Sequence, residues 1–333
     1  MNDASDPNAD STAATLAQQF GWLTNFCGLV ELDDRSFVSV KGEDRQKFLH
    51  NFCTNEIKEL AVSKVCEAFV LNEKGKLLGY VHVIADSEEL LLTGHGQQSE
   101  ILIQHLDKYI IREDVELSDR TDELRAIFVC GDQAAQCLAE LFGELPELNE
   151  SVNSQVESHQ VKIVQTEIAG VGFLLICDAS SVEELKSALL KHNIAQCSRE
   201  ALHFVRVQAK TPWFGIDADE SNLPQELQRD EIAISFEKGC YLGQETVARI
   251  DARGRVNQLL VGFKYAGDGQ PSTGDVLHEE KPAARITSIG ELPFADPQTD
   301  PQTDSQTGAL VALGYVRRQF KEPGTRLGPW IVL

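Results

Sequence analysis

The chain has 333 residues, of which 42% are hydrophobic and 25% are charged, as in soluble globular proteins. This length predicts two to three domains. The net charge of −22 excludes a general binder of nucleic acids or anionic membranes, because binding phosphate requires a surplus of lysine and arginine. The apolar runs are far shorter than the roughly 20 residues of a membrane span, so we expect neither direct nucleic-acid binding nor a membrane segment.

The N-terminal residues 1–20 are acidic and contain neither arginine nor an apolar core. They match neither a secretory signal nor a transit peptide, and we expect a disordered leader. The eight cysteines are dispersed without a CxxC or CxxH pair, which predicts reduced thiols, a cytoplasmic protein and no metal site. These cysteines are Cys27, Cys53, Cys66, Cys130, Cys137, Cys177, Cys197 and Cys240.

The residues after the leader, 21–120, predict a first α+β domain. Two short strands should meet at Asp33 and Asp34, and an amphipathic helix should follow Gly42. A hairpin is expected around the polar turn Asn72–Lys76. The other predicted elements are a strand over 89–94 and a helix over 99–110.

A second α+β domain is predicted over residues 121–198. Its order of strand, helix, hairpin and helix favours a ferredoxin-like unit, with helices on one face of an antiparallel sheet. These elements are expected over residues 123–131, 132–143, 159–178 and 181–193.

Two further regions complete the chain. Residues 199–255 form a return segment, which we expect to pack on the first domain. Residues 256–333 contain short strands separated by glycine and proline, which is typical of a small C-terminal β-barrel. The repeat over 296–308 should form a solvated hairpin loop within this barrel. The predicted fold class is therefore α+β.

The segment FEKGCYLGQETVAR, residues 236–249, is the strongest candidate for a functional site. Its two glycines, Gly239 and Gly243, indicate a tight turn or a close approach of another group. Cys240 precedes a predicted helix and follows Lys238 by two residues, and both features favour the thiolate form of cysteine. Because no second ligand is near in sequence, the thiol is interpreted as a nucleophile, a persulfide carrier or one ligand of a shared cluster. The alternative is a buried cysteine that only fills space.

Other polar residues near this segment are weaker candidates. Arg249, Arg253 and Arg255 form a basic cluster that could bind a carboxylate or phosphate, or could be a solvated face. Trp213 and Phe214 could stack on a flat ring, and core packing is at least an equal interpretation. The histidines are scattered, and we assign none of them a role.

The segment KGCYLGQETVARIDARG resembles the K-G-C-Y-x-G-Q-E signature of the YgfZ-type folate-binding proteins. That family resembles the aminomethyltransferase (T-protein) of the glycine cleavage system, which uses tetrahydrofolate. The similarity extends over most of the chain from about residue 29. Its weaker matches are VKGEDRQKFLHNFCTNEI, LNEKGKLLGYVHV, LDKYIIREDVELSD, NLPQEL, ARITSIG and ALGYVRR.

The resemblance implies three domains in a ring around a central folate pocket, with the cysteine motif near its opening. The implied ligand is tetrahydrofolate or a one-carbon derivative, and a stable iron–sulfur cluster is not expected. The family is implicated in the assembly or repair of iron–sulfur clusters and, through it, in tRNA thiomodification. The implied partners are therefore iron–sulfur enzymes or cluster-assembly proteins that bind transiently.

Site residues carry over by position. Cys240 becomes the functional thiol with Lys238 beside it, and Gly239 and Gly243 shape the turn. The implied folate-binding residues are Arg206, Gln208, Glu226, Tyr241, Gln244, Glu245, Arg249 and Arg253.

The chain departs from the T-protein pattern at several positions. Gln208 stands where T-proteins have a pterin-binding glutamate, and Lys210 replaces a glycine. A neutral amide can hydrogen-bond a pterin edge but offers no bidentate carboxylate. Near the expected position of the catalytic acid the only carboxylate is Glu100, and T-proteins lack the cysteine. These departures disfavour glycine cleavage, although a folate-dependent aminomethyl or methyl transferase is the alternative function. A structural module with a packing cysteine is the third hypothesis.

Overall fold

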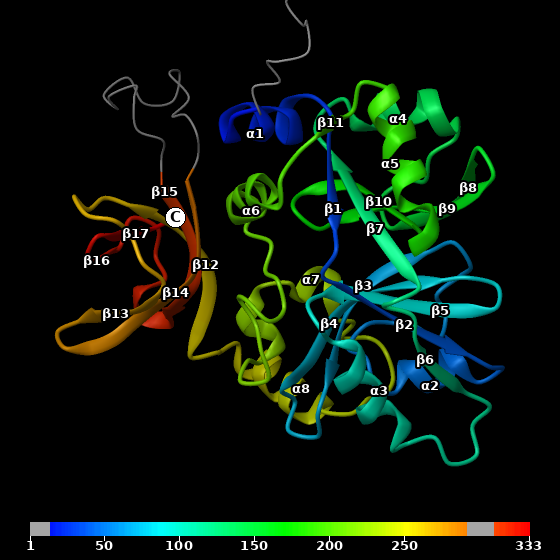
Figure 1. The fold of residues 1–333 in the computed structure, drawn as a ribbon. Coiled ribbons are helices and arrows are strands. Elements are labelled where there is room, and N and C mark those ends of the chain that lie inside the picture. Colours follow the sequence, from blue (N-terminus) through cyan, green and yellow to red (C-terminus); the bar gives the residue numbers. More distant parts are fainter. Residues whose placement is uncertain (1–13, 292–309) are drawn as a thin grey trace, which may run out of the picture.

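The computed structural model describes residues 14–291 and 310–333 and contains three β-sheets (Figure 1). The sheets lie around the return segment, residues 199–255, whose helices run between them (Figure 1). The expected repeat at 296–308 lies outside the described residues. The chain is therefore an α+β protein made of three packed parts.

The first sheet is antiparallel, with strand order β3-β4-β5-β2-β6. Helices α2 (Arg45–His50) and α3 (Ser99–Asp107) pack on it and build an apolar core around Phe48, Leu102 and Val81. All nine residues of β4 are buried, because Val83 faces this core while Ile84 faces the core of the second sheet. The strands are β2 (Arg35–Lys41), β3 (Val65–Leu71), β4 (Leu77–Ala85), β5 (Glu89–His95) and β6 (Glu116–Asp119).

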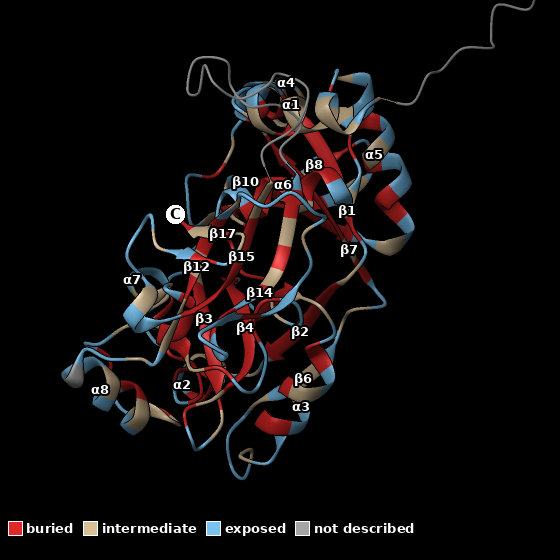
Figure 2. Cartoon of the chain, turned by 90° about the vertical axis from the view of Figure 1, so that its left-hand side faces the viewer, coloured by how far each residue is buried: buried red, intermediate tan, exposed pale blue. Residues whose placement is uncertain are grey.

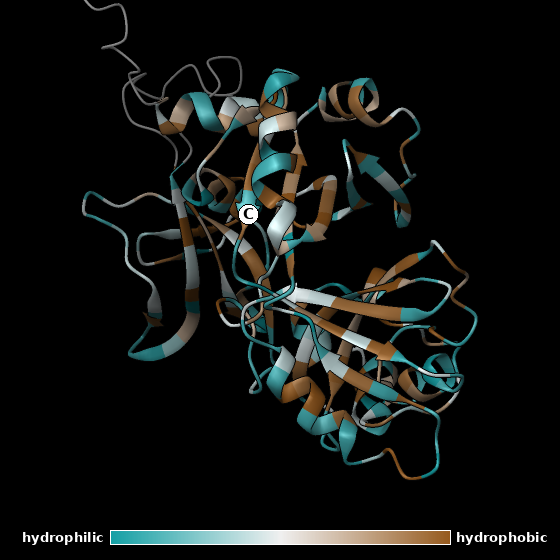
Figure 3. Cartoon of the chain, turned by 45° about the vertical axis from the view of Figure 1, so that its right-hand side comes forward, coloured by the Kyte–Doolittle hydropathy of each residue, from teal (hydrophilic) through white to brown (hydrophobic). Residues whose placement is uncertain are grey.

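The second sheet has the order β11-β1-β7-β10-β9-β8. Its helices, α4 (Ala134–Phe142) and α5 (Val182–Lys191), contribute to a second core. Figure 3 shows hydrophobic residues concentrated on the strands of both α+β parts and hydrophilic residues on outer helical faces and loops. The strands are β1 (Gly28–Leu32), β7 (Leu124–Cys130), β8 (Glu150–Val156), β9 (His159–Glu167), β10 (Val171–Asp178) and β11 (Ala195–Gln196). A short 3-10 helix, Ala179–Ser181, precedes α5.

The N-terminal strand crosses the expected domain boundary. β1 was expected in the first domain, residues 21–120, but it pairs antiparallel with β7 and parallel with β11 in the second sheet. The two strands that meet at Asp33 and Asp34 therefore exist as predicted but belong to different sheets. Alternating apolar residues predict a strand, but they do not identify its partner.

The leader is shorter than expected. Helix α1 (Leu16–Asn25) occupies residues that the sequence assigned to the disordered segment 1–20, and residues 1–13 lie outside the described range. Thr15 and Gln18 form a reciprocal capping box, which satisfies free N–H groups at the helix start. Leu23 of α1 is buried, and the helix packs on α6 (Arg199–Gln208).

The C-terminal sheet has the order β13-β14-β15-β12-β17-β16 and is a nearly closed barrel, as predicted. Its core contains Phe263, Ile286 and Trp330. The strands are β12 (Gln258–Tyr265), β13 (Gly274–His278), β14 (Lys281–Glu291), β15 (Leu310–Arg317), β16 (Arg326–Leu327) and β17 (Trp330–Val332), and a 3-10 helix spans Arg318–Phe320.

The return segment connects the three parts. Helix α6 contacts β14 of the barrel, and α7 (Asp230–Ala233) contacts β3 of the first sheet. A 3-10 helix, Pro224–Leu227, packs against β12, and α8 (Gln244–Arg253) follows the cysteine motif. Figure 2 shows that much of α8 is exposed while the strands behind it are buried. Across residues 14–291 and 310–333, no helix is long and apolar enough to cross a membrane.

Candidate functional site

Lys238 anchors the cysteine motif to the first domain. Its buried ammonium donates hydrogen bonds to the backbone oxygens of His50, Cys53 and Asn55 at 2.6, 2.7 and 2.7 Å. An ammonium has three N–H donors, so these carbonyls use all of them. Burial lowers the pKa of Lys238 to about 8. The expectation that Lys238 assists the thiol is therefore not supported by its contacts, which are structural.

Cys240 is the one exposed cysteine in the described part of the chain. In the first domain, Cys53 is buried and Cys66 is half-buried. Burial raises the pKa of Cys53 to about 12. Buried thiols of this kind behave as small apolar side chains. The interpretation of Cys240 as a buried filler is therefore wrong.

Gly243 is required by a contact between two turns. Its φ is +82°, and a Cβ atom there would lie 2.7 Å from the backbone oxygen of Asn72 and 3.0 Å from Cα of Gly75. Gly75 faces the motif in turn, since a Cβ atom there would lie 2.7 Å from Cβ of Thr246. The hairpin turn Asn72–Lys76 thus packs against the cysteine motif. Gly239 differs, because the nearest atom to a Cβ there, Nε2 of His50, is 3.9 Å away.

The rest of the motif divides into a buried and an exposed part. Tyr241 is buried in a cluster with Tyr80 and Phe214, and Nζ of Lys238 lies 4.9 Å from the centre of its ring. Gln244 is half-buried at the start of α8, whereas Glu245 and Arg249 are exposed. Their i,i+4 spacing produces no ion pair within the described residues. The side chain of Arg253 is not among those that the structure describes.

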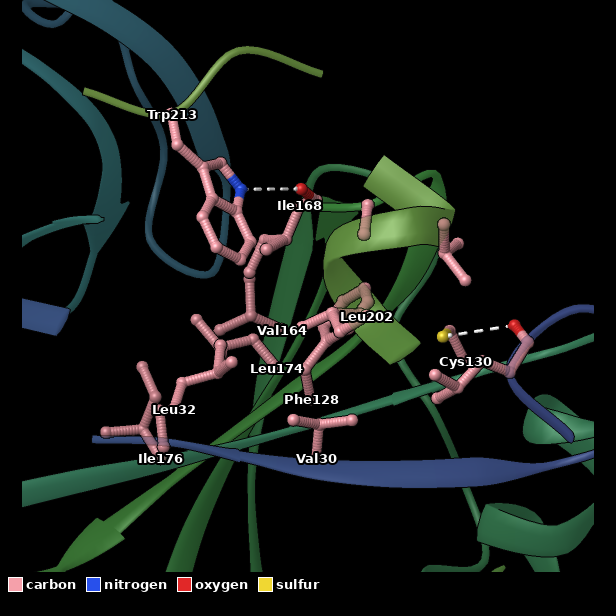
Figure 4. Close-up of a cluster of buried hydrophobic side chains, with 14 of the residues drawn as sticks. Val30, Leu32, Phe128, Cys130, Val164, Ile168, Leu174, Ile176, Leu202 and Trp213 are labelled. Carbon is pink, nitrogen blue, oxygen red and sulfur yellow. Dashed lines mark hydrogen bonds between the residues drawn. The ribbon is translucent and has the colours of Figure 1, made fainter. Parts of the chain in front are cut away.

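A central pocket opens where the first sheet, the second sheet and the return segment meet. It is small, with an accessible volume of about 20 Å³. In the close-up of the adjoining core, Trp213 points toward the second sheet and its Nε1 donates to the backbone oxygen of Ile168 at 3.2 Å (Figure 4). The lining residues are Arg35, Tyr80, His82, Gly94, His95, Glu167, Ile168, Thr211, Pro212, Trp213 and Phe214.

The indole of Trp213 is engaged by protein groups. The ring of His95 stacks on it with centroids 4.2 Å apart and an interplanar angle of 24°, and the guanidinium of Arg206 lies 4.4 Å from the ring centroid. Trp213 is therefore mainly a wall of the pocket. Phe214 lines the same pocket and is half-buried.

Arg206 does not line the pocket, although the sequence placed it among the folate-binding residues. It is fully buried and donates to Oδ2 of Asp217 at 2.7 Å and to Oγ of Ser288 at 2.7 Å. Asp217 also accepts the backbone N–H of Trp213 at 3.0 Å. Arg206 thus joins α6 to the barrel and positions Trp213.

The other expected folate residues also lie outside the pocket lining. Gln208 is exposed at the end of α6. Glu226 is buried, and its Oε2 accepts hydrogen bonds from Asn222 at 3.0 Å and from Gln258 at 3.3 Å. Four more expected residues belong to the cysteine motif and the start of α8, residues 236–249, which we call the motif face. They are Tyr241, Gln244, Glu245 and Arg249, and none of them lines the pocket.

The basic cluster is also arranged differently from the expectation. Arg255 lines a groove with three cations of the barrel, Arg317, Arg318 and Lys321. Arg249 is not part of this lining. The three arginines are close in the sequence, but in the structure Arg255 lines a groove with cations that lie more than 60 positions further along the chain.

Arg35, Tyr80, His82 and Glu167 form the polar wall of the pocket, and Glu67 and Arg229 hydrogen-bond Tyr80 and Glu167 without lining it. Nη2 of Arg229 lies 2.7 Å from Oε1 of Glu67 and 3.0 Å from Oε2 of Glu167, and Tyr80 also donates to Glu67. Arg35 is buried, which lowers its pKa to about 10, and burial likewise lowers the pKa of His82 to about 4.

These residues were not predicted from the sequence. Their one signal was polar side chains within otherwise apolar strands, as in LLGYVHVIA. In the described ranges no three His, Cys, Asp or Glu side chains converge to hold a metal ion.

This fold and arrangement define a member of the GCVT N-terminal domain family, whose model matches residues 7–238. Among curated proteins, the tRNA-modifying protein YgfZ of Yersinia enterocolitica is 28% identical over 250 residues, covering 75% of this chain and 74% of the relative. The tRNA-modifying protein YgfZ of Yersinia pseudotuberculosis is 27% identical with the same coverage. The chain also shares the fold of the glycine cleavage system aminomethyltransferase T from Bartonella henselae, with a TM-score of 0.80 at 18% identity over 95% of this chain and 87% of that one. The family resemblance and the predicted fold are confirmed.

Proposed function

We propose that this protein binds tetrahydrofolate in the central pocket and supports the assembly or repair of iron–sulfur clusters, with Cys240 as its functional thiol. In this role it acts in the cytoplasm, contacts iron–sulfur enzymes or assembly proteins transiently, and serves enzymes that thiolate tRNA. The name of its relatives, tRNA-modifying protein YgfZ, agrees with such a role.

The central pocket is the observation that carries this proposal. It places aromatic side chains, Tyr80 and Phe214, beside polar groups, of which Nη2 of Arg35 and Nε2 of His82 have no hydrogen-bond partner among the described residues. Buried polar atoms without partners are costly, and a heterocyclic ligand would satisfy them. A small pocket with aromatic walls and a few convergent polar groups is typical of a cofactor site.

The motif face supports the second half of the proposal. Cys240 is exposed, and its backbone is fixed on both sides by Lys238 and Gly243. Its neighbour Tyr241 packs with Tyr80 and Phe214, which line the pocket. Tyr241, the residue after Cys240, therefore connects the motif to the wall of the pocket, although Cys240 itself does not line the pocket.

Folate binding is tested by titrating tetrahydrofolate while following tryptophan fluorescence and the thermal midpoint. Because Trp213 lines the pocket, we expect a saturable fluorescence change that a Trp213→Phe variant loses. Ligand at about 100 times Kd should stabilise the fold by about 2.7 kcal/mol and raise Tm by several degrees. The proposal fails if neither signal changes at a large ligand excess.

The role of Cys240 is tested in cells that carry Cys240→Ala as the sole copy. We expect lower activity of iron–sulfur enzymes, while a Cys137→Ala control on α4 leaves activity unchanged. Full activity with Cys240→Ala would exclude the functional thiol. Methylene transfer from an aminomethyl donor to tetrahydrofolate would instead establish the transferase alternative.

A further inference from the structure

His50 lies directly against the cysteine motif. It ends helix α2 and is only 8% exposed, and its backbone oxygen accepts a hydrogen bond from Nζ of Lys238 at 2.6 Å. The backbone oxygen of the next residue, Asn51, accepts the N–H of Leu242 at 2.8 Å. Cys240 stands midway between these two anchored residues. The turn that carries the thiol is therefore pinned at both ends to the residues at the end of α2.

The imidazole of His50 turns Nε2 toward this motif. A Cβ atom on Gly239 would lie 3.9 Å from Nε2, and no other atom beyond its chain neighbours would be within 4 Å. Gly239 is not among the described glycines with positive φ, so neither its backbone nor a clash requires glycine there. The missing side chain leaves Nε2 uncovered beside the residue that precedes Cys240.

Glu56 determines which ring nitrogen carries the proton. Oε1 of Glu56 lies 3.0 Å from Nδ1 of His50, whereas the backbone nitrogens of Ile57 and Lys58 lie 3.4 and 3.3 Å from it. These amide contacts are longer than the usual range of about 2.7–3.2 Å, so the carboxylate is the better partner. Nδ1–H donates to Glu56, and Nε2 keeps its lone pair. Among the described residues, the hydrogen bonds of the ring all involve Nδ1.

The charges around His50 favour the neutral ring. Burial lowers its pKa, and the nearby ammonium groups of Lys238 and Lys58 act in the same direction, while Glu56 opposes them. An imidazole with a pKa below its ordinary value of about 6.5 is neutral at pH 7. It is therefore able to accept a proton there. The carboxylate of Glu56 would then stabilise the imidazolium that forms.

We propose that His50 accepts the proton of the Cys240 thiol, with Glu56 holding the ring in the tautomer that leaves Nε2 free. This inference rests on the proposed role of Cys240 and deepens it. The S–H bond breaks, its electron pair stays on sulfur, and the proton forms an N–H bond on Nε2. The products are a thiolate and an imidazolium, and the thiolate is the nucleophilic form of cysteine. Lys238 cannot take this part, because the backbone carbonyls occupy its three donors.

The rate of iodoacetamide labelling of Cys240, followed against pH by mass spectrometry, tests this transfer. A thiolate formed by internal proton transfer has a population that is independent of pH between the pKa values of the two groups, because the pair neither gains nor loses a proton. The wild type should therefore show a shoulder between about pH 6.5 and 8.5. His50→Gln should lose this shoulder. At pH 6.5 the variant should react about 3- to 10-fold more slowly, and at pH 9.5 within about 2-fold of wild type.

Two further variants complete the test. Glu56→Gln keeps the imidazole but removes the charge that stabilises the imidazolium, so the shoulder should become smaller. The Glu56 side chain is 36% exposed, and this variant decides the question if His50→Gln does not fold. His278→Gln, an exposed histidine of the barrel, is the matched control and should leave the profile unchanged.

Three results would overturn the inference. They are a wild-type profile without the shoulder, a shoulder that both His50→Gln and Glu56→Gln retain, and a loss in His50→Gln that is equal at every pH, which would indicate a structural role alone. The labelling requires neither tetrahydrofolate nor an iron–sulfur enzyme. A confirmed shoulder together with full cellular activity of Cys240→Ala would therefore refute only the proposed function. Lost cellular activity with a shoulder independent of His50 would refute only this inference.

Discussion

The motif face and the central pocket are built in opposite ways. The motif face comes from one continuous segment whose exposed sulfur, Cys240, is flanked by Lys238 and Gly243. The pocket comes from strands of two sheets and from the return segment, and its wall contains buried polar groups such as Arg35 and His82. A local segment can be recognised from its order of residues, whereas a wall made of distant residues exists only after folding. Substitutions should separate the two regions by the kind of damage they cause.

The largest effect is expected beside the pocket, for Arg206→Met. Removal of the guanidinium leaves the fully buried carboxylate of Asp217 without its partner charge. Breaking a buried pair in this way costs about 3–5 kcal/mol, which urea unfolding would measure. Arg249→Met, on the exposed face of α8, is the control and should change stability by less than about 0.5 kcal/mol. Equal losses in both variants would contradict the assignment of Arg206 as a buried connector.

Lys238→Met should cost about 3 kcal/mol on the motif face, because three backbone carbonyls lose their common donor. The loss should also depend on pH. Burial lowers the pKa of Lys238 to about 8 from 10.5, so between these values the unfolded chain binds a proton that the folded chain has released. The stability of the wild type relative to Lys238→Met should therefore rise as pH increases from about 8 to about 10.5.

Unfolding at several pH values would check both parts of this prediction. Lys74→Met, on the exposed hairpin turn, is the matched control. A relative stability that falls across that pH interval would contradict the burial of the ammonium.

Gly243→Ala should cost about 2 kcal/mol, because φ is +82° and the new Cβ would meet the backbone of Asn72. Gly239→Ala in the same motif should be nearly neutral, since its nearest neighbour is 3.9 Å away. Thermal unfolding of the two variants would show whether the close approach of the turns, rather than glycine content alone, sets the shape of the motif. The reverse order of stabilities would refute this geometry.

Cys240→Ala should have the smallest effect on stability, within about 0.5 kcal/mol, because the side chain is exposed. It should, however, remove the fast phase of iodoacetamide labelling, since burial raises the pKa of Cys53 to about 12 and keeps such thiols slow. Mass spectrometry of labelled peptides would identify the reactive residue. Fast labelling of Cys53 instead would invert the comparison between exposed and buried sulfur.

Several elements were predictable because their signals are local. The hairpin around Asn72–Lys76, the helix that follows Gly243, and the strands of the barrel all depend on turn residues and apolar periodicity within a few positions. The disordered leader was overestimated, because the capping pair Thr15 and Gln18 starts a helix within it. The site was predicted less completely, since Arg206 and Glu226 carry charges that the fold satisfies internally.

The sequence by itself determined the α+β class, the barrel, the family motif and the identity of the unusual cysteine, because each of these depends on the order of neighbouring residues. Only the tertiary structure decided that β1 joins the second sheet, that Lys238 binds backbone carbonyls, and that Glu167 faces the pocket. These outcomes depend on which distant strands pair and on where a charge finds its counter-ion. Both are determined by packing and desolvation across the whole chain, and no short segment records them.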